Sequence, residues 1–310
     1  MKKLLLILLP LILISCATKG KTEKVVSSEQ SKAYYNQFWS LWNDDKEDEA
    51  VALLEQWQLE DETDPELYVC YFNMHIDKGT QEQMCIDSSL PPGFQGEYMT
   101  GRNDDGDPIY IYSVIEYDDE ESKLAFDYLD KGISYNPKRL DMYWGKAQFY
   151  FMRGDYDQEI QVIKTAFELN KKYKDSWLWS FNESAKTVGV EFQESIHEYF
   201  VKWYNTGDPA AYPYMMEVCK LYTEEFPDSV VAFNDAGISA ILMNDIEAAK
   251  IYFERGFELD PSDMILLNNV ARINYNLGYI EEAKKYYEIM AASDDPESSE
   301  HAKEILAEYF

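Results

Sequence analysis

The sequence is poor in basic residues for its length. Lys and Arg total 28 against 58 Asp and Glu in 310 residues, which gives a formal net charge of -30. Proteins bind nucleic acids through a basic footprint on the phosphate backbone, so we expect no nucleic-acid partner. The same charge disfavours adsorption of a folded body onto anionic lipid headgroups. Two interpretations stay open: a solvated surface without a target, or a surface that attracts a basic patch on a protein partner.

Histidine is scarce, and the sequence motifs of catalysis are missing. His75, His197 and His301 lie far apart and outside any metal-binding spacing. The sequence contains no nucleophile elbow, no phosphate-binding loop and no dinucleotide-binding glycine motif. The acidic turn around Gly106 does not match a calcium loop, because Tyr112 stands where such a loop needs its last carboxylate. We therefore expect no catalytic residue, no metal site, no dissociable cofactor and no enzymatic activity.

The apolar run at the N-terminus, Leu4 to Ile14, is short. It has about eleven residues, too few for a helix that spans a hydrocarbon core of ~30 Å. It follows Met1-Lys2-Lys3, and a basic start before a short apolar run is typical of a secretory signal. The run ends in Leu13-Ile14-Ser15-Cys16, which resembles the lipobox of bacterial lipoproteins.

The lipobox resemblance implies cleavage before Cys16, a diacylglycerol on its sulfur and an acyl chain on its amine. Two or more acyl chains hold a protein stably on a membrane. Residues 1–15 are then a lipoprotein signal peptide, and residues 16–30, which are polar, are a flexible tether. The expected location is the bacterial cell envelope. Ala17 instead of Asp after the lipidated cysteine favours the outer membrane, on either its periplasmic or its surface side.

Three further cysteines are present, Cys70, Cys85 and Cys219. Export makes a disulfide chemically possible, and Cys70 with Cys85 is the candidate pair. The alternative is that they are small buried thiols, because Cys70 and Cys219 have apolar neighbours in the sequence.

Apolar residues are not short, at 46% of the chain with 15% aromatic, which is ample for a sizeable core. Near the C-terminus they recur with a period of about 34 residues, which is a known repeat length and not a chance spacing. The pairs at this offset are Gly237 and Ala271, Ile246 and Ile280, Ala249 and Ala283, Phe253 and Tyr287, and Pro227 and Pro261.

This pattern of small and aromatic residues resembles the tetratricopeptide repeat, a pair of antiparallel helices A and B. The clearest repeats are residues 140–171, 230–261 and 264–295, with a capping helix at 297–310. In the first of these, Glu159 stands in the usual alanine position and Lys171 in place of the closing proline. The resemblance implies an all-α solenoid over residues 31–310, because one helix pair cannot bury both of its apolar faces alone.

More degenerate helices are expected elsewhere, and residues 172–209 hold an atypical unit. The other predicted helices are Ser31 to Trp42, Glu47 to Gln58, Glu66 to Ile76, Asp119 to Asn136, Glu191 to Tyr204 and Ala210 to Phe226.

Residues 77–117 interrupt the helical pattern with several proline and Asp-Gly turn signals. Tyr110 to Tyr117 is rich in Tyr, Ile and Val, so it is either a strand paired with Gln95 to Thr100 or a short helix A. An insertion of this length in a solenoid is either part of a binding face or a surface excursion without a role.

The family resemblance places partner-binding residues on helix A, where they point away from helix B towards the concave side. These residues are Asn234, Ser239, Asn268, Arg272 and Tyr275. Trp177 and Trp179, expected on a helix, are either core residues or exposed anchors for a peptide or a sugar.

The function predicted is a membrane-anchored scaffold that binds a protein or peptide partner in the envelope, without catalysis. The alternative is a glycan-binding surface lipoprotein that takes part in polysaccharide capture.

Overall fold

The computed structural model describes residues 29–91, 94 and 96–310. They form two compact units, which meet in sequence between Glu191 and Phe192. The predicted signal peptide, Cys16 and most of the tether lie outside the described residues. The first helix begins at Glu29, so residues 29 and 30 belong to the folded body and not to the tether.

The N-terminal unit has six α-helices and one sheet in its described part. The helices are α1 (Glu29–Asn43), α2 (Glu47–Glu60), α3 (Pro65–Gly79), α4 (Asp119–Tyr135), α5 (Leu140–Arg153) and α6 (Tyr156–Tyr173). The strands are β1 (Thr80–Asp87), β2 (Tyr98–Arg102) and β3 (Pro108–Tyr117). Two short 3₁₀ turns follow α6, η1 (Lys174–Ser176) and η2 (Ser180–Asn182).

The C-terminal unit is helical throughout. Its elements are α7 (Phe192–Thr206), η3 (Pro209–Ala211), α8 (Tyr212–Glu225), α9 (Val230–Leu242), α10 (Ile246–Leu259), α11 (Met264–Asn276), α12 (Ile280–Ala291) and α13 (Pro296–Tyr309). The pairs α9–α10 and α11–α12 are the two predicted C-terminal repeats, and α13 is the predicted capping helix.

Three of the four helices of these repeats begin after a residue whose side chain caps the first turn. Ser229, Asp245 and Asp263 accept hydrogen bonds from the first backbone amides of α9, α10 and α11, which have no partner inside the helix. The turn inside a pair needs a residue with positive φ, which Gly adopts freely and Asn tolerates. Asn244 (φ 59°) after α9 and Gly278 (φ 82°) after α11 provide it, at equivalent positions of the two repeats.

Close packing inside a pair explains the repeated small residue. A Cβ added to Gly237 on α9 would lie 2.3 Å from Cε1 of the Phe253 ring on α10, so a larger side chain cannot fit. Phe253 in turn belongs to a core with Ala240, Ala249 and Leu266, which joins α9, α10 and α11. The sequence repeats with this period because the residues that form this core recur once in each helix pair.

The core of the N-terminal unit is centred on α3. Its residues from Pro65 to Ile76 are all buried, so the helix is covered on every side. It packs with α1, α2 and α4 in one cluster that includes Phe38, Trp57 and Leu129. The ring of Tyr71 stacks on that of Tyr128 at a centroid distance of 4.1 Å, which joins α3 to α4.

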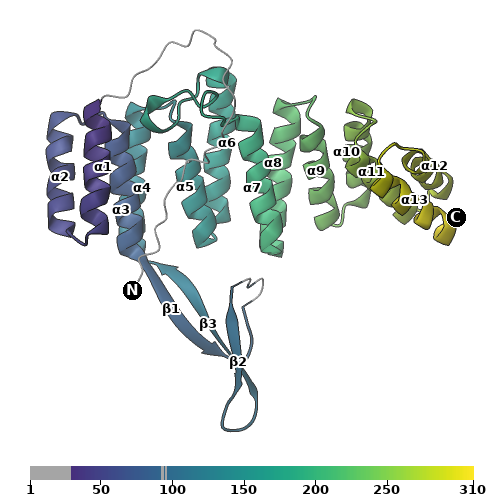
Figure 1. Cartoon of the computed structure of the whole chain (residues 1–310), viewed down its shortest axis with the longest axis horizontal. Helices are drawn as coiled ribbons and strands as arrows, with labels where there is room; N and C mark the ends of the chain where they lie inside the picture. The colour runs from purple at the N-terminus through teal and green to yellow at the C-terminus, as the bar shows by residue number, and fades with distance from the viewer. Residues whose placement is uncertain (1–28, 92–93, 95) are drawn as a thin grey trace. The chain divides into compact units, whose positions relative to one another are not determined.

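The insertion between α3 and α4 is an antiparallel sheet with the strand order β1-β3-β2. The predicted strand pair is confirmed, as β2 and β3, while β1 was missed. In Figure 1 the sheet extends away from the ends of α3 and α4. Its base is fixed where the amide of Asp118 donates to the carbonyl of Gly79 at 2.9 Å.

The segment after α6 is irregular, and the prediction that Trp177 and Trp179 lie on a helix is wrong. Leu178 instead forms isolated bridges with Arg139 and Ser184, and Phe181 has a left-handed backbone (φ 57°). A buried ion cluster fixes this conformation.

The ion cluster consists of Arg139, Glu66 and Asp141. The guanidinium of Arg139, which is fully buried, lies 2.7 Å from Oε1 of Glu66 and 2.7 Å from Oδ2 of Asp141. The amide of Phe181 donates to the same Glu66 oxygen at 2.6 Å. The cluster therefore joins α3, the start of α5 and the irregular segment.

Cys70, Cys85 and Cys219 are free thiols, so the Cys70–Cys85 disulfide is not formed. Burial strongly raises the pKa of the Cys70 thiol, which keeps it protonated. None of the helices in the described ranges combines the length and apolar content that crossing a membrane requires.

The ion cluster gives a stability prediction. Arg139→Met removes the only cation of the cluster and leaves Glu66 and Asp141 buried without a counter-charge, so we expect unfolding to become easier by about 3–5 kcal/mol. The control is Lys123→Met, which breaks an exposed Lys123–Asp127 pair (N–O 3.5 Å) and is expected to cost less than ~1 kcal/mol. Urea unfolding followed by circular dichroism measures both; equal losses would contradict the role of the cluster.

Candidate partner-binding surfaces

Helices α9 and α11 each have four residues in equivalent positions along one side. On each helix four residues at the spacing i, i+3, i+7 and i+10 share a face, and the two sets occupy equivalent positions of the two repeats. We call the surface they form the α9–α11 face. Its residues are Val231, Asn234, Ile238 and Ile241 on α9, and Ile265, Asn268, Arg272 and Tyr275 on α11.

The α9–α11 face exposes apolar side chains that the core does not use. Ile265 is 67% exposed, Ile241 41%, Val231 39% and Tyr275 37%. Asn234 and Asn268 lie between them and are half-buried. Exposed apolar side chains that gather on one face mark a candidate site for a protein segment.

The two asparagines occupy equivalent positions in the two repeats. Asn269 Nδ2 donates to Asn234 Oδ1 at 2.9 Å, which ties α11 directly to α9. Oδ1 of Asn268 is shielded from solvent and has no hydrogen-bond partner among the described residues. A carboxamide carries both a donor and an acceptor, so it can pair with the backbone of an extended peptide.

Arg272 is the only charged residue of the α9–α11 face, although the chain as a whole is strongly acidic. It is exposed, and its positive charge lowers the pKa of Tyr287 against the larger effect of burial, which raises it. Guanidinium groups bind carboxylates through two parallel hydrogen bonds. The face therefore suits an apolar segment that carries an acidic group.

The structure separates the predicted binding residues. Asn234, Asn268, Arg272 and Tyr275 lie together on this face, and their role in binding stays a prediction. The prediction that Ser239 binds the partner is wrong, because Ser239 is fully buried and its hydroxyl lies 3.4 Å from the Cys219 thiol on α8. Helix A has one side against its own helix B and another against the preceding repeat, and Ser239 lies on the second.

Tyr275 also contacts the end of the chain. Its ring meets those of Tyr309 and Phe310 edge-on, at centroid distances of 6.0 and 5.7 Å. These contacts hold the tyrosine at the border of the face.

The two tryptophans do not form an exposed pair. Trp177 is 3% exposed, and its indole nitrogen donates to Asn170 Oδ1 at 2.9 Å, so it is a core residue. Trp179 is half-buried in the irregular segment. Trp177 therefore cannot stack on a sugar in this conformation.

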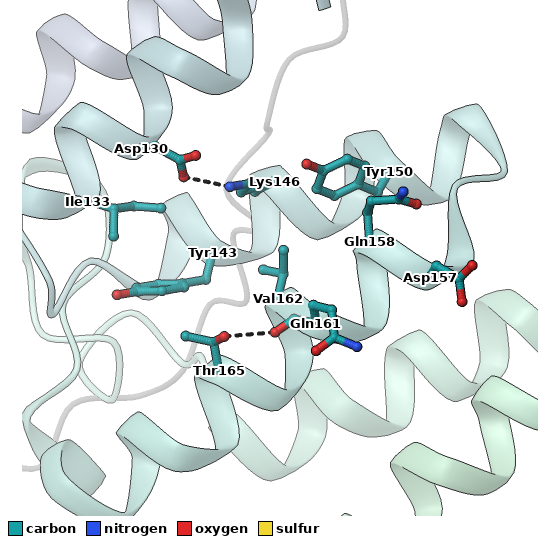
Figure 2. Close-up of a pocket in the computed structure, with 10 residues that line it drawn as sticks. All are labelled: Asp130, Ile133, Tyr143, Lys146, Tyr150, Asp157, Gln158, Gln161, Val162 and Thr165. Atoms are coloured by element: carbon teal, nitrogen blue, oxygen red, sulfur yellow. Dashed lines mark hydrogen bonds and ion pairs between the residues drawn. The ribbon is translucent and has the colours of Figure 1, made fainter. Parts of the chain in front are cut away.

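The N-terminal unit has a hollow of its own, an open pocket of about 650 Å³ between α4, α5 and α6. Figure 2 shows the side chains that line it: Asp130, Ile133, Tyr143, Lys146, Tyr150, Asp157, Gln158, Gln161, Val162 and Thr165. The apolar part comes mainly from α4 and α5, and the amides come from α6.

An ion pair forms part of the lining of this pocket. Lys146 Nζ is 2.6 Å from Asp130 Oδ1, and the lysine side chain is 16% exposed (Figure 2). Burial, and then the charges of Tyr173 and Asp130, raise the pKa of Tyr143 to about 12, so its hydroxyl stays a donor. The pocket can hold one side chain or a short segment. It was not predicted, because its walls come from three helices without a common sequence period.

A partly exposed histidine paired with a buried aspartate joins α7 to α9. His197 Nδ1 on α7 lies 2.8 Å from Oδ2 of Asp235, which is fully buried next to Asn234. Across the described ranges, no three His, Cys, Asp or Glu side chains come together as a metal ion would require.

The comparisons with known proteins agree with the repeat. The tetratricopeptide repeat family model matches residues 232–263 and 266–288, so these two segments are tetratricopeptide repeats. They coincide with α9–α10 and with α11 and most of α12. The comparison with curated proteins gives no match.

Several solved structures are similar at low identity. YrrB, described as a TPR protein with an unusual peptide-binding site, is 16% identical over 60% of this chain and 84% of its own, with a TM-score of 0.35. PilW, a type IV pilus biogenesis factor, is 11% identical over 90% and 99%, with a TM-score of 0.38. The C-terminal part of a TPR repeat-containing protein from Cytophaga hutchinsonii is 12% identical over 88% and 93%, with a TM-score of 0.40. Scores this low carry no conclusion about partners.

The His197–Asp235 pair makes the C-terminal unit sensitive to pH. The hydrogen bond with Asp235 raises the pKa of His197, against the opposing effect of burial. A folded-state pKa above the unfolded value of about 6.5 means that the pair stabilises the unit fully below that pH. The contribution is lost as pH rises through the raised pKa.

We expect the thermal midpoint of the C-terminal unit to fall between pH 6 and pH 8.5. Because the imidazole is partly exposed, the loss is at most about 1 kcal/mol. His197→Gln should flatten this dependence, while His301→Gln, at an exposed position on α13, should leave it unchanged. A dependence that survives in His197→Gln would show that another group titrates.

Proposed function

Starting from these two tetratricopeptide repeats, we propose that the protein is a lipid-anchored scaffold of the bacterial cell envelope. In this proposal the α9–α11 face binds an extended, mainly apolar segment of a protein partner, with an acidic group of the segment on Arg272. The single observation that carries the proposal is the recurrence of exposed apolar side chains around an asparagine at the same positions of both repeats.

The side chains of the α9–α11 face can provide the free energy of binding a partner without any covalent change. Ile241, Ile265 and Tyr275 supply apolar surface, which provides most of the affinity of such interfaces. The asparagines and Arg272 fix the orientation, because a backbone or carboxylate group left unpaired on binding would cost free energy. Tetratricopeptide repeats generally serve as non-catalytic scaffolds, and the protein is proposed to have no enzymatic activity.

The anchor is the second part of the proposal. It is supported by the basic and apolar N-terminal segment and by the Leu13-Ile14-Ser15-Cys16 match to the lipobox. A body held by lipid on Cys16 would meet its partner in the envelope, with the outer membrane as the proposed site. No observation in the structure favours the glycan alternative.

Photocrosslinking tests the α9–α11 face with a matched control. Ile265 on α11 and Ile251 on α10 are both isoleucines with 67% exposure, but only Ile265 belongs to the face. With a photoreactive residue at position 265 we expect a covalent adduct with one envelope protein, identified by mass spectrometry, and none at position 251. Arg272→Glu should weaken the adduct about tenfold, the effect of losing ~1.4 kcal/mol. Equal adducts at both positions would contradict the assigned face.

Metabolic labelling tests the anchor. Cells that express the native chain with labelled palmitate should yield a labelled protein in the membrane fraction, because Cys16 carries the acyl chains. Cys16→Ser should abolish the label and release the body from the membrane, while Cys85→Ser should change neither. The same labelling result for the native chain and Cys16→Ser would rule out the anchor.

A further inference from the structure

The three-stranded sheet is covered at one point. Tyr112 is the one buried residue of its strands, with 7% exposure, and the ring of Phe94 packs edge-on against Tyr112 at a centroid distance of 5.0 Å. The Tyr112 hydroxyl donates to Asp87 Oδ2 at 2.6 Å. Phe94 therefore shields Tyr112 on this face of the sheet.

The opposite face is apolar and exposed. The register places Ile86, Ile111 and Met99 side by side across the three strands, so their side chains share one face. We call it the bare sheet face, and its apolar residues are Met84, Ile86, Met99, Ile109, Ile111 and Ile115.

The apolar side chains of this face are largely exposed. Met84 is 70% exposed, Met99 63%, Ile86 62% and Ile115 42%. Together these four side chains expose on the order of 400 Å², the size of the largest apolar patch on a typical monomer, and such patches are often functional. The sheet extends away from the helices of its own unit (Figure 1), so they leave this face open.

The dimensions fit one helix. Three strands span about 10 Å between the outer two, and the diameter of a helix with its side chains is also ~10 Å. From Ile109 to Ile115 the strand rises about 20 Å, which matches a helix of ~13 residues. A helix lying on the sheet would bury the apolar patch, whereas an added edge strand would leave it exposed.

The charge around the face specifies the partner further. Residues 80–117 carry seven acidic residues and one basic residue, Arg102, a much larger imbalance than the 58 to 28 of the whole chain. By the register, Glu82 lies on the bare sheet face, whereas Asp87 and Glu116 lie on the opposite face. The other four, Glu97, Asp104, Asp105 and Asp107, lie just outside the ends of β2 and β3, and we call these four together with Glu82 the acidic rim. Such a rim attracts cations on a partner.

We propose that the bare sheet face docks one basic amphipathic helix of a protein partner, with its apolar side on Ile86, Ile111 and Met99. This surface belongs to the N-terminal unit and is independent of the α9–α11 face. The acidic rim disfavours a second copy of the same sheet and an anionic lipid surface, because both would bring like charges together.

A synthetic peptide tests the proposal on the full chain in phosphatidylcholine nanodiscs. The probe is a 14-residue amphipathic Leu/Lys helix with a fluorescent label, and the control is the same composition in scrambled order. We expect the helix to bind at least tenfold tighter than the scrambled peptide. The double variant Ile86→Ser with Met99→Ser should lose at least tenfold in affinity.

Matched variants separate this site from other causes. Tyr98, the neighbour of Met99, is 50% exposed on the other face, so Tyr98→Ser should leave the affinity unchanged. Ile265→Ser, on the α9–α11 face, should also leave it unchanged. Equal binding by all variants would show attraction to the acidic body alone and overturn the proposal. Self-association or direct nanodisc binding of the sheet that Ile86→Ser with Met99→Ser abolishes would overturn it too.

Discussion

A pair of antiparallel helices has two apolar sides and can cover only one of them by itself. In the C-terminal unit α9 and α10 cover each other around Phe253, and α11 covers the next side through Leu266 and Val270. The outer apolar side of the last pair, α11–α12, is covered by α13, whose Ala302 packs in one cluster with Leu267 and Tyr287. Because this packing repeats with each helix pair, the side chains that packing leaves free recur as well, and they form the α9–α11 face.

The helices of the N-terminal unit must also cover their apolar sides, but they do so without a regular repeat. Its central helix α3 is covered on all sides, and a buried arginine with two carboxylates joins it to α5 and to the irregular segment after α6. The turn between α3 and α4 is replaced by a sheet whose one face has no cover among the described residues. The protein thus carries two exposed apolar surfaces of different chemistry, one with a single cation and one with an acidic rim.

The repeats could be predicted because core residues such as Gly237 and Phe253 have equivalents 34 residues later in the sequence, Ala271 and Tyr287. Strand β1 could not, because Thr80–Asp87 is mostly polar and pairs with β3, which follows it only after β2, so no short turn signals the pairing. Ser239 was misplaced because periodicity shows which residues avoid helix B, but not which ones the preceding repeat covers. The core position of Trp177 was one of the predicted alternatives, but the helix expected around it is wrong because a buried ion cluster, formed by residues far apart in sequence, sets the local backbone.

We propose that the stacked repeats leave the α9–α11 face free to hold a partner segment. Hydrogen exchange with mass spectrometry, on the protein alone and with the partner identified by crosslinking, tests it most directly. We expect slower exchange in α9 and α11 on binding, with little change in α1 and α2. Protection confined to other helices, with α9 and α11 unaffected, would contradict it.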